Sequence, residues 1–580
     1  MKVIISIFLA PLLLVLIRNR IKKDIFQSFI KKYLNAFLFV NGISTIVSFL
    51  CWHLFNLNDP NFYYLYTYAY LLFTYSLAIL SPFFEDKITI YSLEDLKKKK
   101  VNWERLFYIF ATILFLMNFI RIFDNAFWGD EGFSIRLAKM SLSEMIKATA
   151  DDVHPPLYYM FLQALYKVFG NHGITYHLSG FLPYAAIVVI SATWVKKRFG
   201  ITTASILVGF ASISNNALIY NVEARMYSLA ALFVLCAYLS LYEILHDNKD
   251  KYWYLLGIFA VLASYTHYYS FVSVALLYLG LIIHCFLDHR YIKKTIKLCL
   301  FSLIGYAPWF LVLLSSFKRT SAGWWSDAIP TYRSCYMFLF DNDTRINIFF
   351  IILICFLFHE SKTINIQREE RNERGLFFNL SIKKGKMDLD IEWILIGLLS
   401  LFGTMCVGIS VSKLLRPLFL TRYLYPVAPL AYLLMGFGTS RLPYRRLVGF
   451  ALVFLLIFDQ VPYYQNMVWS EIDLNLQTKE FLEVVKPDER AVIYTNDSHL
   501  DWTLLDYYYP LNEHIRTKDA TVALRKNVDD IWLFWSAKMD TDFLMMARNK
   551  GYRIELVHES RFANDFYYKV YHLTKANSTR

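Results

Sequence analysis

Apolar stretches of bilayer-spanning length alternate with short polar stretches along most of the first 461 residues. A helix needs roughly 20 apolar residues to cross about 30 Å of hydrocarbon. Because lipid offers no partner to an open strand edge, each stretch is expected to be a helix. The expected spans lie near 3–17, 34–55, 64–84, 104–122, 177–195, 201–220, 226–245, 252–266, 269–287, 296–316, 346–358, 391–411, 423–439 and 446–461, of which 3–17 and 346–358 are the short ones.

The composition agrees with a membrane protein. The chain has 580 residues, of which 56% are hydrophobic and 18% charged, whereas about a quarter of the residues of a soluble domain are charged. Its seven cysteines form no CxxC pair, which argues against a zinc site or a disulfide framework. Arg18, Arg20, Lys22 and Lys23 follow the apolar stretch 3–17, whereas Lys2 alone precedes it, so we expect an anchor and no cleaved signal peptide.

The basic residues predict which side each loop faces. The formal net charge is +13, and clusters of Lys and Arg lie at 97–100, 196–198, 293–294 and 445–446. If the 104–122 helix runs outward from the cytoplasm, all of these clusters are cytoplasmic, as the positive-inside rule requires. Loop 123–176 and the chain after about residue 462 then lie outside. Since the basic residues follow the topology, we expect contacts with membrane lipids and no nucleic-acid partner.

The tail after residue 462 is expected to be a soluble module. Runs near 490–495, 531–535, 552–558 and 566–573 have the composition of short strands, and 477–485 and 541–550 look helical. This alternation predicts a small α/β domain that serves as a cap or docks a partner. The expected organisation is a membrane extension of three helices (1–102), a transmembrane catalytic domain (103–461) and an extracytoplasmic α/β domain (462–580).

Ionisable groups gather in the predicted outer segments. Such groups are costly near a bilayer, so they indicate a functional site. Asp130-Glu131 could supply a general base or a helix-start acid. Prolines 155 and 156 fix His154, near Asp152, at a helix start, where His154 is either functional or a buried structural histidine.

Three later motifs complete the set. Tyr220–Tyr227 contains Glu223, Arg225 and Tyr227; Arg225 is suited to holding a phosphate through its fork, although a structural Glu–Arg pair is the alternative. His267 lies at a turn between spans, where a structural role is also open. Arg422, followed by Tyr423, defies the positive-inside pattern, which favours an anionic ligand.

An outer carboxylate and outer cations fit transfer of a sugar from a lipid phosphate. A base is needed for the acceptor hydroxyl, and cations offset the charge that builds on the departing phosphate. The alternatives are a transporter or flippase of lipid-linked glycans, and a structural membrane subunit. A transporter often shows paired repeats and broken midplane helices, which are not evident in the sequence.

The order of these motifs resembles the GT-C glycosyltransferases, closest to glycosyltransferase family 39 with its protein O-mannosyltransferase and aminoarabinose-transferase branch. The resemblance covers roughly residues 103–460 and rests on Asp130-Glu131, Asp152–Leu157, Glu223–Tyr227 and Arg422–Pro426. The first hundred residues lie outside it. Tyr158-Tyr159 replaces the usual Gly-Lys continuation, which weakens the case for a protein Ser/Thr acceptor.

The resemblance implies a helical GT-C bundle, a polyprenyl-phosphate sugar donor and inverting transfer on the outer face. Asp130 would be the base, Glu131 would assist it or orient the loop, and Arg225 and Arg422 would face the donor phosphate. The acceptor would be a glycan, a lipid or a protein, and the location a bacterial plasma membrane. Relatives that bind a divalent metal through an acid and a histidine make Glu131, Glu223 and His267 the metal candidates. The full set of substrate-binding candidates is Asp152, His154, Glu223, Arg225, Tyr227, His267, Arg422 and Tyr423.

Overall fold

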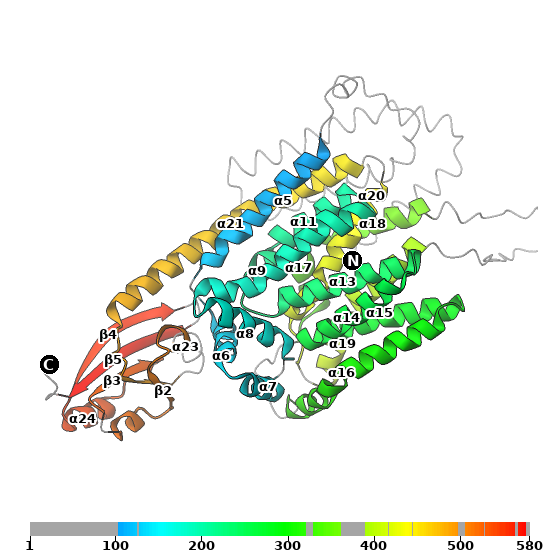
Figure 1. Ribbon diagram of the computed structural model, residues 1–580. Helices are drawn as coiled ribbons and strands as arrows, with labels where there is room; N and C mark the ends of the chain where they lie inside the picture. Colours follow the sequence, from blue (N-terminus) through cyan, green and yellow to red (C-terminus); the bar gives the residue numbers. More distant parts are fainter. Residues whose placement is uncertain are drawn as a thin grey trace, which may run out of the picture.

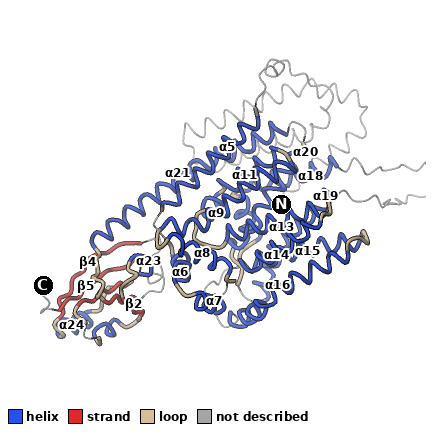
Figure 2. Tube along the Cα trace, viewed as in Figure 1, coloured by secondary structure: helices blue, strands red, loops and turns tan. Residues whose placement is uncertain are grey.

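The computed structural model describes residues 102–124, 127–152, 154–320, 329–360, 389–415, 417–442, 445–496, 505–526, 528–536, 538–562 and 566–575. The expected spans at 3–17, 34–55 and 64–84 lie outside the described residues, and so does the polar stretch 361–388. The described chain has two parts, a helical body and a small sheet module, connected by the long helix α21 (Figure 1). The strands of the described residues all lie in the module, at one end of the described structure (Figure 2).

The helical body is built from the described helices before the sheet. They are α5 (Trp103–Phe119), the 3₁₀ turn η2 (Ile120–Phe123), α6 (Gly129–Lys139), α7 (Leu142–Asp151), α8 (Leu157–Phe169), α9 (Gly173–Ile190), the π-helical turn η3 (Ser191–Val195), α10 (Lys196–Phe199), α11 (Ile201–Ile213), α12 (Asn215–Tyr220), α13 (Tyr227–His246), α14 (Asp250–Thr266), α15 (Tyr268–Leu287), α16 (Ile292–Thr320), α17 (Tyr332–Phe340), α18 (Asp343–Glu360), α19 (Leu389–Leu414), the 3₁₀ segment η5 (Thr421–Val427), α20 (Ala428–Arg441) and α21 (Arg445–Val484).

Within the described residues, six helical stretches are long and apolar enough to cross a membrane: Trp103–Phe123, Gly173–Phe199, Tyr227–His246, Tyr268–Leu287, Ile292–Ser315 and Leu389–Leu414. They confirm the spans expected near 104–122, 177–195, 226–245, 269–287, 296–316 and 391–411. In α13, 89% of the most apolar window is buried inside the protein. This helix is therefore the centre of the bundle, and the other helices surround it.

The remaining expected spans differ in detail. The 201–220 stretch is two helices, because Ser214 is extended (ψ 154°) between α11 and α12. The 423–439 stretch begins as η5, whose Pro426 cannot donate to an α-helical ladder. The 446–461 stretch is the first part of α21, which continues to Val484. The helix expected at 477–485 is thus the end of α21, and this helix crosses the expected domain boundary at residue 461.

The helices α6 and α8 pack inside the protein. Apolar and polar residues alternate over 133–140, a pattern that predicts a helix along the membrane surface, but Ser134, Ile135, Leu137 and Ala138 of α6 are buried. Tyr158, Tyr159 and Leu162 of α8 are also buried. The polar residues on these helices therefore face protein neighbours, which is the arrangement that builds the site.

The sheet module is a mixed α/β layer structure. Its five strands are β1 (Val492–Thr495), β2 (Glu513–Arg516), β3 (Asp530–Trp535), β4 (Tyr552–Phe562) and β5 (Phe566–Lys575), in the order β2-β1-β3-β5-β4. The helix α24 (Thr541–Asn549) and the turn η7 (Ala520–Leu524) cover one face, and the end of α21 covers the other. β1 is parallel to both β2 and β3, whereas β5 is antiparallel to β3 and β4.

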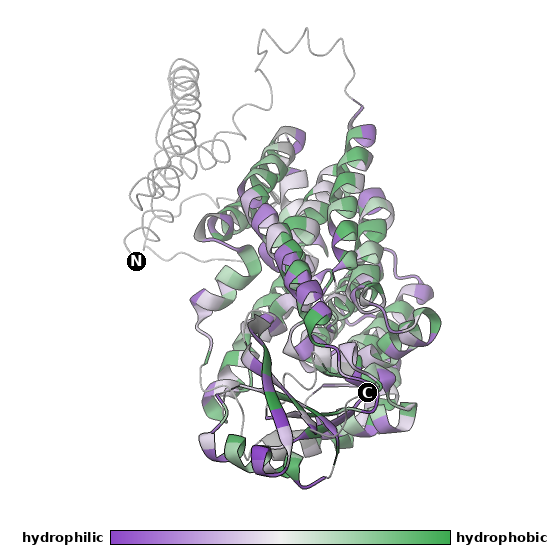
Figure 3. Cartoon of the chain, turned by 90° about the vertical axis from the view of Figure 1, so that its left-hand side faces the viewer, coloured by the Kyte–Doolittle hydropathy of each residue, from purple (hydrophilic) through white to green (hydrophobic). Residues whose placement is uncertain are grey.

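Hydropathy separates the two parts. Apolar residues dominate the helices of the body, while polar residues increase along the far end of α21 and on the sheet module (Figure 3). The four strands expected from the sequence are present, and β2 was missed. Its side chains are exposed or half-buried, so this edge strand lacks the apolar alternation that marks a buried one.

Candidate active site

The two neighbouring acids in the first turn of α6, Asp130 and Glu131, have different surroundings. Glu131 Oε2 accepts the backbone N–H of Trp128 (3.3 Å), and Oε1 accepts the backbone N–H of Ala224 (2.8 Å). Burial, then the charge of Glu223, raises the pKa of Glu131 well above its usual value. Glu131 is therefore a helix-start acid that also ties α6 to the segment before α13.

Asp130 points its carboxylate at two arginines. Its Oδ2 lies 3.0 Å from Arg422 Nη1 and 3.9 Å from Arg225 Nη2. The Asp130 side chain is 29% exposed, whereas the Arg225 side chain is 3% exposed. The structure thus brings together the three groups that the sequence analysis placed in one site, and it leaves Asp130 accessible.

Arg225 is held by α6 and α8. Its Nη1 donates to the backbone oxygen of Asp130 (3.1 Å), to Ser134 Oγ (3.3 Å) and to Tyr159 OH (3.5 Å). Its Nη2 donates to His154 Nε2 (3.1 Å). The N–H groups of a guanidinium point in fixed directions, so these hydrogen bonds fix the orientation of the Arg225 side chain. A Glu223–Arg225 pair, the structural alternative, is not among the ion pairs of the described residues.

Arg422 is the more accessible of the two arginines. It lies in η5 and its side chain is 20% exposed. Its guanidinium carbon lies 5.5 Å from the centre of the Trp128 ring, within the range of a cation–π contact. Trp128 Nε1 in turn donates to Glu223 Oε1 (2.8 Å). Trp128 therefore connects the α6 start, the segment before α13 and η5.

The two predicted histidines are neutral and have defined tautomers. Arginine can only donate, so His154 Nε2 must accept and its proton lies on Nδ1. His267 Nδ1 accepts the backbone N–H of Tyr269 (3.2 Å), which leaves the proton on Nε2. Burial, then the positive charge of Arg225, lowers the pKa of both rings, that of His267 to about 3. His267 is also the N-terminal cap of α15.

Glu223 and the other metal candidates do not form a metal site. Burial raises the pKa of Glu223 to about 7, against the opposing charges of Arg225 and Arg422. No group of three or more His, Cys, Asp or Glu side chains that could hold a metal occurs in the described part of the chain. The oxygens of Glu131 face backbone amides and His267 Nδ1 is occupied. The residues present therefore do not fit a divalent ion.

The remaining substrate-binding candidates surround the histidines. Tyr227 is the first residue of α13, and its ring centre lies 5.8 Å from that of His267. The Tyr423 ring lies 5.0 Å from His267 on another side. Asp152 is at the end of α7, close enough to Tyr159 and Tyr423 to act on them electrostatically. All the predicted residues thus lie in or beside one site.

Sequence reasoning missed four residues of this site. Trp128 lies two residues before Asp130 and Tyr159 lies two residues after Leu157, and neither was given a role. Ser134, one helical turn after Asp130, carried a positional signal that was not used. Nothing in the sequence around His177 pointed to a role in the site. Its Nδ1 donates to the Val222 carbonyl (2.7 Å) and lies 3.9 Å from Glu131 Oε1. Such a contact depends on how α9 packs, which the local pattern does not reveal.

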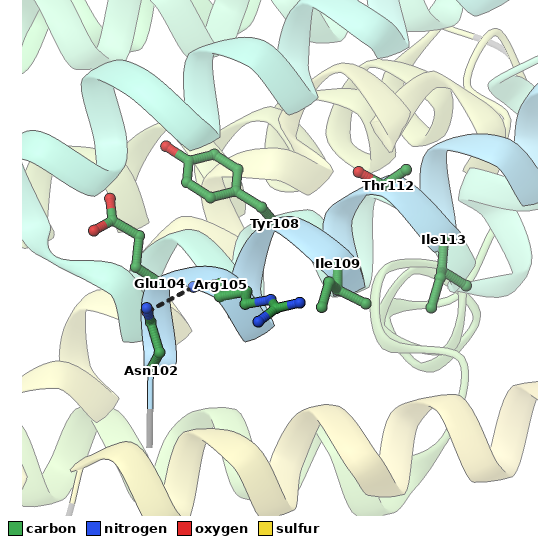
Figure 4. A pocket seen from close by; sticks show the side chains of 7 residues that line it. All are labelled: Asn102, Glu104, Arg105, Tyr108, Ile109, Thr112 and Ile113. Carbon is green, nitrogen blue, oxygen red and sulfur yellow. Dashed lines mark hydrogen bonds between the residues drawn. The ribbon is translucent and has the colours of Figure 1, made fainter. Parts of the chain in front are cut away.

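A separate pocket lies along the first turns of α5. It has a volume of about 580 Å³ and is lined by Asn102, Glu104, Arg105, Tyr108, Ile109, Thr112 and Ile113 (Figure 4). Asn102 caps the helix by accepting the backbone N–H of Arg105 (3.0 Å). None of the predicted site residues lines this pocket, which is at the opposite end of α5 from the segment leading to Asp130.

The chain was compared with known proteins. Residues 153–312 match the model of the family described as Dolichyl-phosphate-mannose-protein mannosyltransferase. This region includes His154, Glu223, Arg225 and His267. No curated protein matches the sequence.

One solved structure shares the architecture at low sequence identity, and two further matches are weaker. ArnT from Cupriavidus metallidurans bound to undecaprenyl phosphate is 14% identical with a TM-score of 0.50, and the alignment covers 83% of this chain and 99% of that one. The apo form of the same protein is 14% identical with a TM-score of 0.49, and the alignment covers 80% of this chain and 97% of that one. The arabinosyltransferase EmbB from Mycobacterium smegmatis is 11% identical with a TM-score of 0.35, and the alignment covers 65% of this chain and 33% of that one.

The fold likeness and the family match agree with the observed site. A bundle around α13, the helix α6 that carries Asp130, the α7–α8 connection that carries His154, and a C-terminal module are all present in the described chain. The match to the mannosyltransferase family is confined to residues 153–312, less than a third of the chain. The described helices include membrane-spanning ones and share the fold of ArnT.

Proposed function

We propose that the protein transfers a sugar from a polyprenyl-phosphate donor to an acceptor hydroxyl, with inversion at the anomeric carbon. The observation that carries the proposal is the convergence of Asp130, Arg225 and Arg422, in which one carboxylate oxygen lies 3.0 and 3.9 Å from two guanidinium nitrogens. The solved fold neighbour bound to undecaprenyl phosphate supports this class of donor. The acceptor is a glycan, a lipid or a protein.

The proposed step is a single displacement. The acceptor hydroxyl gives its proton to Asp130 as its oxygen forms a bond to the anomeric carbon. The bond from that carbon to the phosphate oxygen breaks, and polyprenyl phosphate leaves with the electron pair. Attack opposite to the leaving group inverts the carbon. No separate acid is needed, because the phosphate is already a good leaving group.

The arginines have complementary tasks in this proposal. Arg422 is partly exposed and binds the donor phosphate, where its charge offsets the negative charge of the leaving group. Arg225 is buried and holds Asp130, Ser134 and His154 in place. When the phosphate pairs with Arg422, it replaces Asp130 as the partner of that arginine. The carboxylate is then available to accept the proton.

The proposal includes the location of the reaction. The positive-inside pattern supports an orientation with α6–α8 and the sheet module on the outer face, and we propose that the membrane is a bacterial plasma membrane. The division into a membrane extension (1–102), a catalytic domain (103–461) and an outer α/β domain (462–580) belongs to the same proposal. Labelling of single cysteines introduced at exposed positions such as Lys147 and Lys197, in intact cells, tests which side each loop faces.

The first test is the donor dependence of an Arg422→Gln variant. The expected result is a rise in KM for the polyprenyl-phosphate sugar of about 10- to 100-fold, because a hydrogen bond to a charged group contributes roughly 1.5–3 kcal/mol. Steady-state kinetics of purified protein, with polyprenyl phosphate release as the readout, measures the effect.

The matched control is Lys413→Gln. Lys413 is exposed at the end of α19, with its ammonium 5.9 Å from the Tyr332 ring. This variant removes the same charge from the same predicted side and should leave KM unchanged. An unchanged KM in Arg422→Gln would remove Arg422 from the donor site. Movement of the intact lipid across the membrane without sugar transfer would instead favour a transporter.

A second prediction concerns Gly180 in α9. A Cβ at this position would lie 2.6 Å from the backbone oxygen of Glu223 and 3.1 Å from the carbonyl carbon of Val222. These are backbone atoms, so Gly180→Ala must displace the segment that carries Arg225. Since a shift of about 1 Å can cost on the order of 10²-fold in rate, kcat should fall by about that factor.

The control for this variant is Gly209→Ala in α11. A Cβ there meets its nearest neighbours at 3.5 Å or more, which is ordinary contact. Alanine also favours the helix by roughly 0.5–1 kcal/mol, so this variant should keep its activity and its thermal stability. Equal activity of the two variants would show that the Val222–Glu223 backbone tolerates the shift.

A further inference from the structure

The sheet module contacts the segment that carries Asp130. Its short helix α23 (Asp506–Tyr508) lies against the helical body next to α6 (Figure 1). The ring of Tyr507 packs edge-on against Phe127 at 4.9 Å and against Tyr176 at 5.9 Å. The backbone oxygen of Tyr507 accepts a hydrogen bond from Asn171 Nδ2 (3.3 Å). Phe127 is three residues before Asp130, so the contact is close to the proposed base.

Tyr507 belongs to the core of the body and not to that of its own module. Leu505 and Tyr509, two residues to either side, are buried in the module core with Phe481 and Phe534. Tyr507 instead packs on the main core of the helical body. Replacing its ring therefore removes a contact between the two parts without emptying the core of the module.

The contact continues from Phe127 into the site. Phe127 stacks on His177 at 5.0 Å, and His177 Nδ1 donates to the Val222 carbonyl. The residue after Val222 is Glu223, which accepts the hydrogen bond from Trp128 Nε1. Arg225 lies two positions after Glu223. Tyr507 is thus connected by direct contacts to both segments that hold the charged groups.

A second connection lies on the other side of the same loop. Arg121 in η2 pairs with Glu471 of α21, with Nε 3.0 Å from Oε1. Asn475 of α21 donates to Asp124 Oδ1 (2.8 Å). The described loop residues between α5 and α6 are therefore held by α21 at one end and by α23 at the other.

We infer that the sheet module is a positioning element for the active site, and that Tyr507 is a positioning residue acting through Phe127 and His177 on Asp130 and the Arg225 segment. The inference rests on the proposed function for its kinetic consequence. A module that served only as a cap or a partner-docking domain would leave turnover unaffected by the loss of this one ring.

The test compares Tyr507→Ala, Tyr507→Phe and Leu511→Ala in the full-length protein. Tyr507→Ala should lower kcat about 10- to 100-fold with little change in KM for the donor, because the base is displaced while Arg422 remains in place. Tyr507→Phe keeps the ring and should restore most of kcat. Leu511 is 70% exposed in the same module, so its replacement should have no effect.

A double variant separates this path from general damage. If Tyr507 acts through Phe127, adding Tyr507→Ala to Phe127→Ala should lower kcat by less than the product of the two single effects. Independent effects that multiply, or a kcat of Tyr507→Ala within twofold of wild type, would overturn the inference.

Hydrogen exchange gives a readout that does not depend on activity. In Tyr507→Ala, backbone amides in 127–139 should exchange faster, while those of β3 keep their protection. Unchanged exchange in 127–139 also overturns the inference. A wild-type protein that transfers no sugar from polyprenyl phosphates would instead refute the proposed function, and exchange would still decide the role of Tyr507.

Discussion

The Asp130→Asn enzyme is expected to lose a factor of about 10²–10⁴ in kcat while its KM for the lipid donor does not rise. The size follows from the usual contribution of a general base. The unchanged or lower KM follows from the charges, since the carboxylate lies 3.0 and 3.9 Å from two guanidinium nitrogens. Removing the negative charge leaves Arg225 and Arg422 less compensated and thus more attractive to a phosphate.

The measurement is steady-state kinetics with a polyprenyl-phosphate sugar, together with direct binding of the donor to the variant. Asp151→Asn is the matched control, because Asp151 is an exposed carboxylate at the end of α7. Wild-type kcat in Asp130→Asn would remove the proposed base. A raised KM with normal kcat would show that Asp130 orients the donor and takes no proton.

The sequence predicted most of the body because its signals there are local. Length and hydropathy identify spans such as the one predicted near 226–245, and each charged motif stands near a helix end, where polar residues can be recognised without knowing the fold. Asp130, Arg225 and Arg422 were named for these reasons. Their convergence could be expected only by adding the family resemblance, since no local pattern says which helix ends meet.

Other features needed the tertiary structure. His177 contacts Glu131 and the Val222 carbonyl only because Gly180, three residues later, lets α9 approach that backbone. The aromatic path from Tyr507 joins residues nearly 400 positions apart, and an aromatic residue in the C-terminal module looks like any core tyrosine in the sequence. The metal candidates failed for a related reason: the oxygens of Glu131 were already committed to backbone amides.

Packing gives the two neighbouring carboxylates, Asp130 and Glu131, different partners. Both residues stand in the first turn of α6, and either could have capped the helix. Glu131 has the longer side chain and reaches back to the Trp128 amide and across to Ala224. Asp130 is then free to face the arginines. Glu131 is therefore the helix-start acid of the two sequence alternatives, and the proposed role of base is left to Asp130.

Arg225→Gln is the second variant with a large expected effect. Arg225 donates to the Asp130 backbone, Ser134, Tyr159 and His154, so its loss removes a donor from the buried Tyr159 hydroxyl and His154 Nε2. Truncating one member of a buried charged pair costs roughly 2–5 kcal/mol, which corresponds to about 30- to 5,000-fold in kcat/KM. Arg225→Lys should recover only a small part, because one ammonium cannot reproduce the fork.

The control must separate lost stability from lost chemistry. Arg345 is also a buried arginine, with 7% of its side chain exposed, and it pairs with Asp341 and Asp459 away from the site. Arg345→Gln should lower the melting temperature to a similar extent, since breaking a buried ion pair costs about 3–5 kcal/mol. Its kcat/KM below the melting transition should stay near wild type. If the two variants lose activity equally at equal stability, Arg225 only holds the fold together; if Arg225→Gln alone is inactive, its fork sets the geometry in which Asp130 takes the proton.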